Sequence, residues 1–453
     1  MVGVRAGVAA ALLGLGGACG QDPSVAPPNL LLISIDTLRA DVLGCYGSAR
    51  NTSPTIDRLA REGTRFADCS STAPWTLPAH ASLLTGTYPT THGVKNHERR
   101  LDPARATLAT RLLDRGFETR AIVNSHHLGD PRYGLQEGFR ETTYIAELDA
   151  STRTVANCGE EVNARAAAAL ASMRQPFFLF LHYYDAHTAY RAGEPYDGMF
   201  VEPYDGPMKA TTRQLSRYRI RGQDITGRDG RFLRQRYEAE VRRVDDLVEV
   251  LLARLDELGL AENTIVVLTS DHGEEFGERG GAMHGRSQYQ EVLHVPLIIK
   301  GPGLATDRVV HEPVSLIDVA PTILGALDPR DETGFEGIDL SGTLRGEVFP
   351  AAERLLFAEA DHENWIDRKS YADVVRMVRL GGAKLCYNEV LDRFELFDLE
   401  LDPAELHDRL AEEPELARRL KLELRRFAAR EQGGIAIPPP GAEQQKRLDD
   451  MGY

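Results

Sequence analysis

Two carboxylates and a histidine in this sequence have the types and settings expected of metal ligands. Asp271 and His272 stand together at the start of DHGEEFGERGGAMHG (residues 271–285), directly after an apolar run and just before Gly273. On a tight turn, such a pair can present an oxygen and a nitrogen to one cation. Asp36 ends another apolar run, and two carboxylates with one histidine leave a coordination position open. We therefore predict a divalent metal site at these residues, for Zn or Mn rather than Ca.

A threonine is the candidate for that open position. Thr76 precedes Pro78 in TAPWTLPAHASLLTG (residues 72–86), where Pro78 fits the first turn of a helix, Thr76 its cap and Gly86 its end. A hydroxyl at a helix N-terminus faces unpaired backbone N–H groups and the positive end of the helix dipole, which favour an anionic nucleophile. Thr76 is thus either a nucleophile or only a cap.

A further polar group follows a third apolar run, in HYYDAHTAY (residues 182–190). Its ionisable residues could protonate a leaving group, bind phosphoryl oxygens or hold a second metal; a polar cluster at a domain seam is the alternative. With His284 from the Gly-rich loop, these residues complete the predicted site. We assign Thr76, His187, His284 and His182 to catalysis, and His127, His80, Asn124 and Asp185 to substrate binding.

Other polar residues near these motifs receive structural assignments. A solvated acidic loop is the alternative interpretation that accounts for Glu274, Glu275 and Glu278, but it does not explain an Asp-His pair directly after an apolar run. Arg39, His92 and His97 are expected to be structural or peripheral.

The elements that must position these residues alternate along the chain. Near-continuous apolar runs, typical of strands buried on both faces, occur at residues 29–36, 119–124, 177–184, 264–271 and 295–301. Helical stretches such as SPTIDRLAREG (residues 53–63) lie between them, which predicts a largely parallel sheet with helices on both sides. Because ligand sites in such sheets collect at the carboxyl ends of the strands, we expect the polar clusters to converge there.

The chain divides into three parts. Residues 1–26 are predicted to be a signal peptide or lipoprotein leader, residues 27–345 a catalytic domain, and residues 346–453 a small subdomain with an extended tail. In the last part, shorter strand patterns precede a charged helix at residues 414–430. The Arg- and Gly-rich segment 207–230 is expected to be an irregular surface insertion or lid.

The N-terminus and the net charge restrict the location and the partners. Arg5, a short apolar run and LGGAC ending at Cys19 indicate export to the periplasm or cell surface, with either lipidation of Cys19 as a membrane anchor or simple secretion. A formal net charge of −15 argues against nucleic acid, since phosphate contacts need a basic face. The expected partner is a small-molecule, glycan-linked or lipid-linked anionic ester.

Together these stretches resemble the sulfatase-type members of the alkaline phosphatase superfamily. The resemblance is carried mainly by NLLLISIDTLRADVLGCYG (residues 29–47), TLPAHASLLTGTYPTTHG (residues 76–93) and the Asp-His loop, and continues to FELFDLELDPAELHDRL (residues 394–410). It implies an alkaline-phosphatase-like α/β sandwich with a large, mostly parallel sheet and a small C-terminal antiparallel sheet.

The sequence departs from the sulfatase pattern at the nucleophile. Sulfatases carry CxPxR, in which the cysteine is oxidised to formylglycine and the arginine helps to hold that residue and the metal; here these positions are Thr76 and His80. A formylglycine hydrate expels sulfate with its second hydroxyl, whereas a threonine ester must be broken by water or another acceptor. This pattern is similar to the threonine-nucleophile phosphoesterases and phosphoryl transferases of the superfamily.

The ligand pattern departs as well. One of the family's paired N-terminal aspartates is replaced by Thr37 after Asp36, and a lysine that grips sulfate falls near Ser125, so its charge is lost.

Three functions are compatible with these residues. The first is a metal-dependent hydrolase of phosphate esters, especially diesters, or a phosphoryl-group transferase, acting through a covalent Thr76 intermediate. The second is a sulfuric ester hydrolase that works without formylglycine. The third is a non-catalytic surface lipoprotein that binds a glycan or another anion, which the retained hydroxyl and metal ligands argue against.

Overall fold

The computed structural model describes residues 27–145, 158–221, 224–328, 334–350, 353–366, 369–432, 434–438 and 441. The predicted leader with Cys19 and most of the C-terminal tail lie outside these ranges. In the described part of the chain, no helix is long and apolar enough to cross a membrane.

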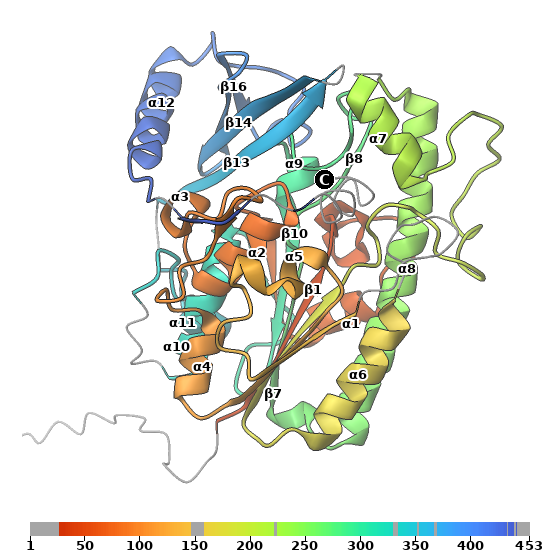
Figure 1. The fold of residues 1–453 in the computed structure, drawn as a ribbon, viewed down its shortest axis with the longest axis vertical. Coiled ribbons are helices and arrows are strands. Elements are labelled where there is room, and N and C mark those ends of the chain that lie inside the picture. Colours follow the sequence, from red (N-terminus) through yellow and green to blue (C-terminus); the bar gives the residue numbers. More distant parts are fainter. Residues whose placement is uncertain are drawn as a thin grey trace, which may run out of the picture.

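A large central sheet carries the fold (Figure 1). Its strand order is β11-β2-β10-β7-β1-β6-β4-β5, with β12 beside β2. The strands are β1 (Asn29–Ile35), β2 (Thr64–Ser70), β4 (Glu118–Val123), β5 (Glu141–Tyr144), β6 (Phe177–Tyr183), β7 (Thr264–Thr269), β10 (His294–Lys300), β11 (Arg308–Val310) and β12 (Val314–Ser315).

The sheet is mostly parallel, as predicted, but β10 runs against its neighbours. β1 pairs in parallel with β6 and β7, whereas β10 is antiparallel to β7 and β2. The chain between β7 and β10 contains only the short elements β8 (Glu275–Phe276), β9 (Ala282–Met283) and α9 (Gln290–Leu293). No crossover helix returns the chain to the end of the sheet where β7 begins, so β10 enters the sheet in the opposite direction.

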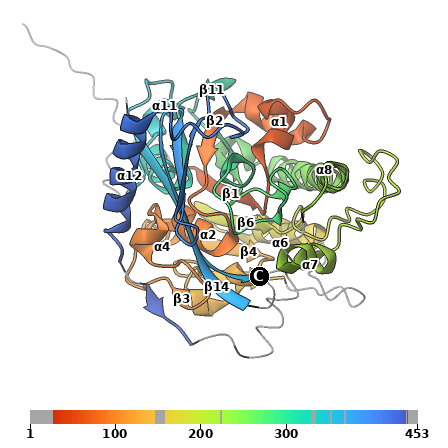
Figure 2. The ribbon, with the colours of Figure 1, turned by 90° about the horizontal axis from the view of Figure 1, so that it is seen from above.

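Helices cover both faces of this sheet (Figure 2). Alternate residues of β1 point to opposite sides: Leu31 and Ile33 join one buried cluster, and Leu30 and Leu32 join the other. The first cluster includes side chains of α1 (Pro54–Glu62), α6 (Gly159–Ser172), α7 (Thr212–Arg221) and α8 (Gly227–Glu257). The second includes side chains of α2 (Thr76–Thr85), α4 (Leu108–Asp114), α5 (His126–Gly129), α10 (Val319–Leu327) and α11 (Ser341–Leu344).

The segment predicted to be irregular, 207–230, contains α7 and the start of α8, so that prediction was wrong. Thr226 caps α8 by accepting the Asp229 N–H, and Gly227 and Gly230 fall within the first turn. Gly230 lies so close to the Phe276 backbone that a Cβ would not fit there, and the arginines of the segment favour helix.

A separate antiparallel sheet lies beyond the large one (Figure 1, top). It has the order β13-β14-β15-β16, with β13 (Leu355–Ile366), β14 (Lys369–Leu380), β15 (Ala383–Asn388) and β16 (Arg393–Asp398). α12 (Pro414–Ala428) packs Leu420, Leu424 and Phe427 against it. The remaining short elements are α3 (Pro89–His92), β3 (Arg99–Arg100) and β17 (Ile435–Ala436).

Candidate active site

The predicted metal ligands meet at the carboxyl ends of three adjacent strands. β1 lies between β6 and β7, and Ser34 is level with His182 on β6 and Thr269 on β7. Asp36 therefore emerges beside both neighbouring strand ends. Its carboxylate lies 3.4 Å from His182 Nε2 and 3.8 Å from His272 Nε2.

The buried donor set fits a divalent cation. One ligand atom each from Asp36, Asp271 and His272 lies within 4.8 Å of the others. His272 Nδ1 donates to the Gly273 carbonyl at 2.9 Å, which leaves Nε2 with its lone pair towards the carboxylates. Asp271 Oδ1 accepts two backbone N–H groups, while its Oδ2 is buried without a hydrogen-bond partner among the described residues. A buried carboxylate oxygen left in this way is a typical metal ligand.

The pKa values of the two carboxylates at this site are shifted in opposite directions. Burial, with the adjacent charges of Asp271 and Glu274, raises the pKa of Asp36 well above its ordinary value. Burial also opposes ionisation of Asp271, but His272, His80 and His182 together hold its pKa below the ordinary value. The protein alone therefore stabilises one buried negative charge here and not the second.

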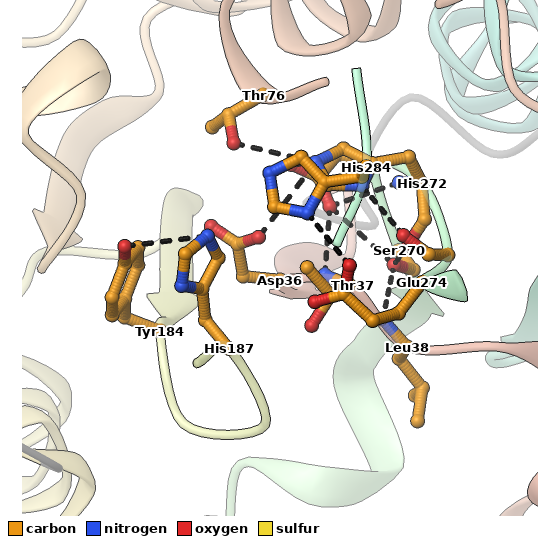
Figure 3. A network of polar contacts seen from close by, with 12 residues as sticks. Asp36, Thr37, Leu38, Thr76, Tyr184, His187, Ser270, His272, Glu274 and His284 are labelled. Carbon is orange, nitrogen blue, oxygen red and sulfur yellow. Dashed lines mark hydrogen bonds and ion pairs between the residues drawn. The ribbon is translucent and has the colours of Figure 1, made fainter. Parts of the chain in front are cut away.

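Thr76 lies directly above this cluster (Figure 3). Helix α2 begins at Thr76 itself, with Trp75 as the cap residue, so the prediction that Thr76 caps the helix was off by one position. Its side chain turns inward instead: Oγ1 lies 3.4 Å from His272 Nε2 and contacts the Asp36 carboxylate. Gly86 ends the helix with a left-handed backbone, as predicted.

His80 lies one turn further along α2, and both ring nitrogens are engaged. Nδ1 donates to the Thr76 carbonyl at 2.9 Å, and Nε2 accepts from the Ser34 hydroxyl at 2.9 Å. Nδ1 is also 3.5 Å from Asp271 Oδ2, while burial lowers the pKa of His80 to about 4. His80, His182 and Asp271 also lie close enough together to share a cation, and the predicted substrate contact of His80 stays a prediction. The ring of His80 anchors the Thr76 backbone.

His182 faces Asp36 with its Nε2. Its Nδ1 donates to Asn124 Oδ1 at 3.2 Å, and the Tyr184 N–H donates to the same oxygen at 2.8 Å. His182 Nε2 has no hydrogen-bond partner within the described chain, and burial lowers the pKa of His182 to about 4. A neutral imidazole with a free lone pair suits a metal ligand better than a proton donor. Asn124 orients this ring through Oδ1, while its Nδ2 is buried without a hydrogen-bond partner among the described residues, so its predicted substrate contact stays a prediction.

His284 and Glu274 form a buried pair on the other side of the cluster (Figure 3). Glu274 is fully buried, and its Oε1 lies 3.0 Å from His284 Nδ1. The His284 ring lies 4.3 Å from the His272 ring and 5.0 Å from the His187 ring. The alternative interpretation of a solvated acidic loop is therefore wrong for Glu274, and also for Glu275, which is buried as well. The sequence signal for a buried Glu274 was its position immediately after the Asp-His-Gly turn.

His187 lies beside Tyr184. Its Nδ1 donates to the Thr188 carbonyl at 3.1 Å, and its Nε2 lies 3.4 Å from the Tyr184 hydroxyl. Burial lowers the pKa of His187 to about 3, so the ring is neutral at physiological pH.

Asp185 takes no part in this cluster. Its carboxylate pairs with Arg243 on α8 and accepts the Gly159 N–H at 3.3 Å. Because Arg243 neutralises it, the predicted substrate contact of Asp185 has no support.

His127 belongs to an aromatic group next to Thr76. It stacks on His97 with ring centroids 5.1 Å apart, and Trp75 lies 4.9 Å from His97 and 5.7 Å from His127. His97, expected to be structural or peripheral, is part of this aromatic group. Arg39 and His92 fit their structural assignment: Arg39 pairs with Asp41 and Glu278, and His92 bonds Ser82 inside the fold.

The fold and the site define an α/β ester hydrolase of the alkaline phosphatase superfamily. The sulfatase family model matches residues 28–329, and the chain belongs to that family. Mouse steryl-sulfatase is 31% identical over 424 residues, covering 74% of this chain and 68% of its own. An ulvan-active sulfatase of Formosa agariphila is 28% identical over 372 residues, with 74% and 68% covered.

The fold itself matches a solved structure of a related type. The phosphonate monoester hydrolase of Agrobacterium radiobacter superposes with a TM-score of 0.73 at 22% identity, covering 91% of this chain and all of that one. Sulfatase-family enzymes bind a divalent metal, and the residues above fit one.

Proposed function

We propose that this chain is a metal-dependent hydrolase of phosphate esters, with diesters as the preferred class, or a phosphoryl-group transferase, and that Thr76 is its nucleophile. One observation carries the proposal: the Thr76 hydroxyl, at the first residue of α2, lies 3.4 Å from His272 Nε2 and against Asp36. The N-terminal N–H groups of α2 favour an anion at the same point.

Asp36, Asp271 and His272 would hold the cation, with His182 as a fourth ligand. When bound, it would act as a Lewis acid towards the ester oxygen and lower the pKa of the hydroxyl. Glu274 orients His284 through Nδ1, which directs the other nitrogen into the site. His284 is the candidate to protonate the leaving group, and His187, which is neutral, is the candidate to stabilise the transition state.

The reaction proceeds in two displacements at phosphorus. Thr76 Oγ1 forms a bond to phosphorus while the bond to the leaving alcohol breaks, and the alcohol departs with a proton. Water, or the hydroxyl of an acceptor, then attacks the threonine phosphoester and restores the Thr76 hydroxyl. The neutral histidines around the site suit an ester with one negative charge, which favours a diester over a dianionic monoester.

The test uses bis-nitrophenyl phosphate with purified wild type, Thr76→Ser and Thr76→Ala. Thr76→Ser keeps a hydroxyl and is expected to retain turnover, whereas Thr76→Ala should lose about 10³-fold or more in kcat. Turnover by Thr76→Ala at the wild-type rate would rule out the nucleophile.

Sulfuric ester hydrolysis without formylglycine is the second candidate, favoured by the sulfatase relatives. Turnover of matched nitrophenyl sulfate and phosphate esters by one preparation separates the two functions. We also propose that the chain is exported, with residues 1–26 as its leader.

A further inference from the structure

The loop that carries His284 contains the short β8–β9 strand pair and three glycines in a left-handed conformation. Gly277, Gly280 and Gly285 all have positive φ, at 90°, 79° and 95°. Glycines lose more conformational freedom on ordering than other residues, so a loop built on them needs contacts from elsewhere.

Contacts at the first end of this loop come from the C-terminal part of the chain. Arg279 donates to the backbone carbonyls of Ala404 and Glu405 at 3.0 and 3.1 Å, in the stretch that follows β16. Its guanidinium also lies over the Tyr289 ring, 3.6 Å from the centroid. The arginine thus ties both ends of the loop to the small sheet.

A buried ion pair secures the second end. Lys384 on β15 and Glu405 are both fully buried, with Nζ 2.7 Å from Oε1. Glu405 Oε2 accepts the Gln290 N–H at 2.6 Å, and Lys384 Nζ donates to the Gln290 side chain at 3.3 Å. Because burying two charges costs much of what their attraction returns, such a pair contributes more to geometry than to net stability.

The same segment then reaches the metal-ligand turn. Gln290 begins α9, whose other residues bond that turn: the Gly273 N–H donates to the Val292 carbonyl at 2.7 Å, and the Glu274 N–H donates to the Glu291 carbonyl at 3.0 Å. Gly273 and Glu274 directly follow His272 in the chain. α9 therefore lies between the small sheet and the site.

We infer that the small C-terminal sheet acts as a positioning element of the active site: Arg279, Lys384 and Glu405 hold residues 279–290 and α9, and so fix His284 and the turn of Asp271 and His272. The roles of these residues rest on the proposed function. Arg279, Lys384 and Glu405 are positioning residues that do not touch the substrate.

The experiment combines backbone hydrogen exchange with steady-state kinetics on the full chain. Arg279→Met and Lys384→Met each remove one attachment, and Arg409→Met is the matched control. Arg409 is a partly exposed arginine that pairs with Asp398 and Glu413 and not with the loop residues or Glu405. Arg279 is also partly exposed, so its variant tests the inference even if Lys384→Met does not fold.

Amides of residues 279–290 are expected to exchange about 10-fold faster or more in both variants, and those of β1, β6 and β7 as in wild type. On bis-nitrophenyl phosphate, kcat should fall by about 10-fold or more with KM within about 2-fold, because misplacing catalytic groups affects the transition state most. Arg409→Met should match wild type in both readouts.

Unchanged exchange in both variants would overturn the inference, and so would faster loop exchange with an unchanged kcat. A wild-type protein without esterase activity would instead count against the proposed function, while the exchange result would still decide whether the sheet holds the loop.

Discussion

The substitution Asp36→Asn should make the metal-free protein more stable and should abolish its stabilisation by metal. In the absence of a cation, burial and the charges of Asp271 and Glu274 raise the pKa of Asp36. An amide of the same shape removes that charge. It also removes a metal ligand. The gain in metal-free stability and the loss of metal binding therefore both come from removing one carboxylate.

The size of the effect follows from the spacing of the two carboxylates. At a separation of up to 4.8 Å, two negative charges repel by about 3.5 kcal/mol at an effective dielectric constant of about 20. Asp36 avoids part of this by binding a proton, which leaves a gain of about 1–3 kcal/mol for Asp36→Asn. For a chain of this length that corresponds to a rise in Tm of about 1–3 °C.

The direction in which pH changes the stability of the variant relative to wild type also follows from the raised pKa of Asp36. A carboxyl group whose folded pKa exceeds its unfolded value of 3.8 binds its proton more tightly when folded, so its contribution to stability is lost as pH rises from about 4 through the folded pKa. Asp36→Asn lacks this loss. The stability of the variant relative to wild type should therefore grow with rising pH across that interval.

Differential scanning calorimetry in chelator, and then with Zn²⁺ or Mn²⁺ at about 100 times Kd, measures these effects. Metal should stabilise wild type by about 2.7 kcal/mol and leave Asp36→Asn unchanged. Asp41→Asn is the control, with the opposite effect on stability. Desolvation acts to raise the pKa of Asp41, but the charge of Arg39 lowers it overall, so removing this carboxylate should lower the stability. The reasoning would be refuted if Asp36→Asn had a lower Tm than wild type in chelator. It would also be refuted if metal stabilised the variant as much as wild type.

Three further outcomes are expected. Glu274→Gln should lower kcat by about 10–100-fold and steepen the dependence of rate on leaving-group pKa, and an unchanged dependence would exclude Glu274 as the partner of the proton donor. Asn124→Ala should lower metal affinity by about 10–100-fold in a chelator competition assay, while Asn124→Asp, which keeps the acceptor, should lose less. Arg243→Met should cost about 3–5 kcal/mol in denaturant unfolding, and adding Asp185→Leu should recover much of it; no recovery would mean that the pair is not coupled.

The convergence of Asp36, His182 and Asp271 could be predicted from the sequence because it follows from topology. Each residue lies at or near the carboxyl end of an apolar run, and parallel strands bring these ends to one edge of the sheet. The pattern of residues and the family resemblance were sufficient to predict the class of fold and the small C-terminal sheet. They did not show that β10 is reversed, since an apolar run looks the same in either direction.

The finer geometry depends on partners that are distant in sequence. Arg243 lies 58 residues beyond Asp185, and no local pattern connects the two. Glu274 sits in a polar, Gly-rich stretch that reads as exposed, and only the loop folding back places His284 against it. The same applies to Asn124 and His182, since a hydrogen bond between neighbouring strands decides which nitrogen faces the site.

Helix α2 keeps its place without a contribution from the side chain at its first position. The cap residue Trp75 makes no side-chain capping bond, and Pro78 lies in the first turn, where its missing N–H has no intrahelical role. Leu77, Leu83 and Leu84 are buried in the core. The residue at position 76 can therefore change while the backbone beneath it stays where it is. In evolutionary terms, the reacting atom is exchangeable by a few nucleotide changes, so the substrates of such a chain can diverge faster than its architecture.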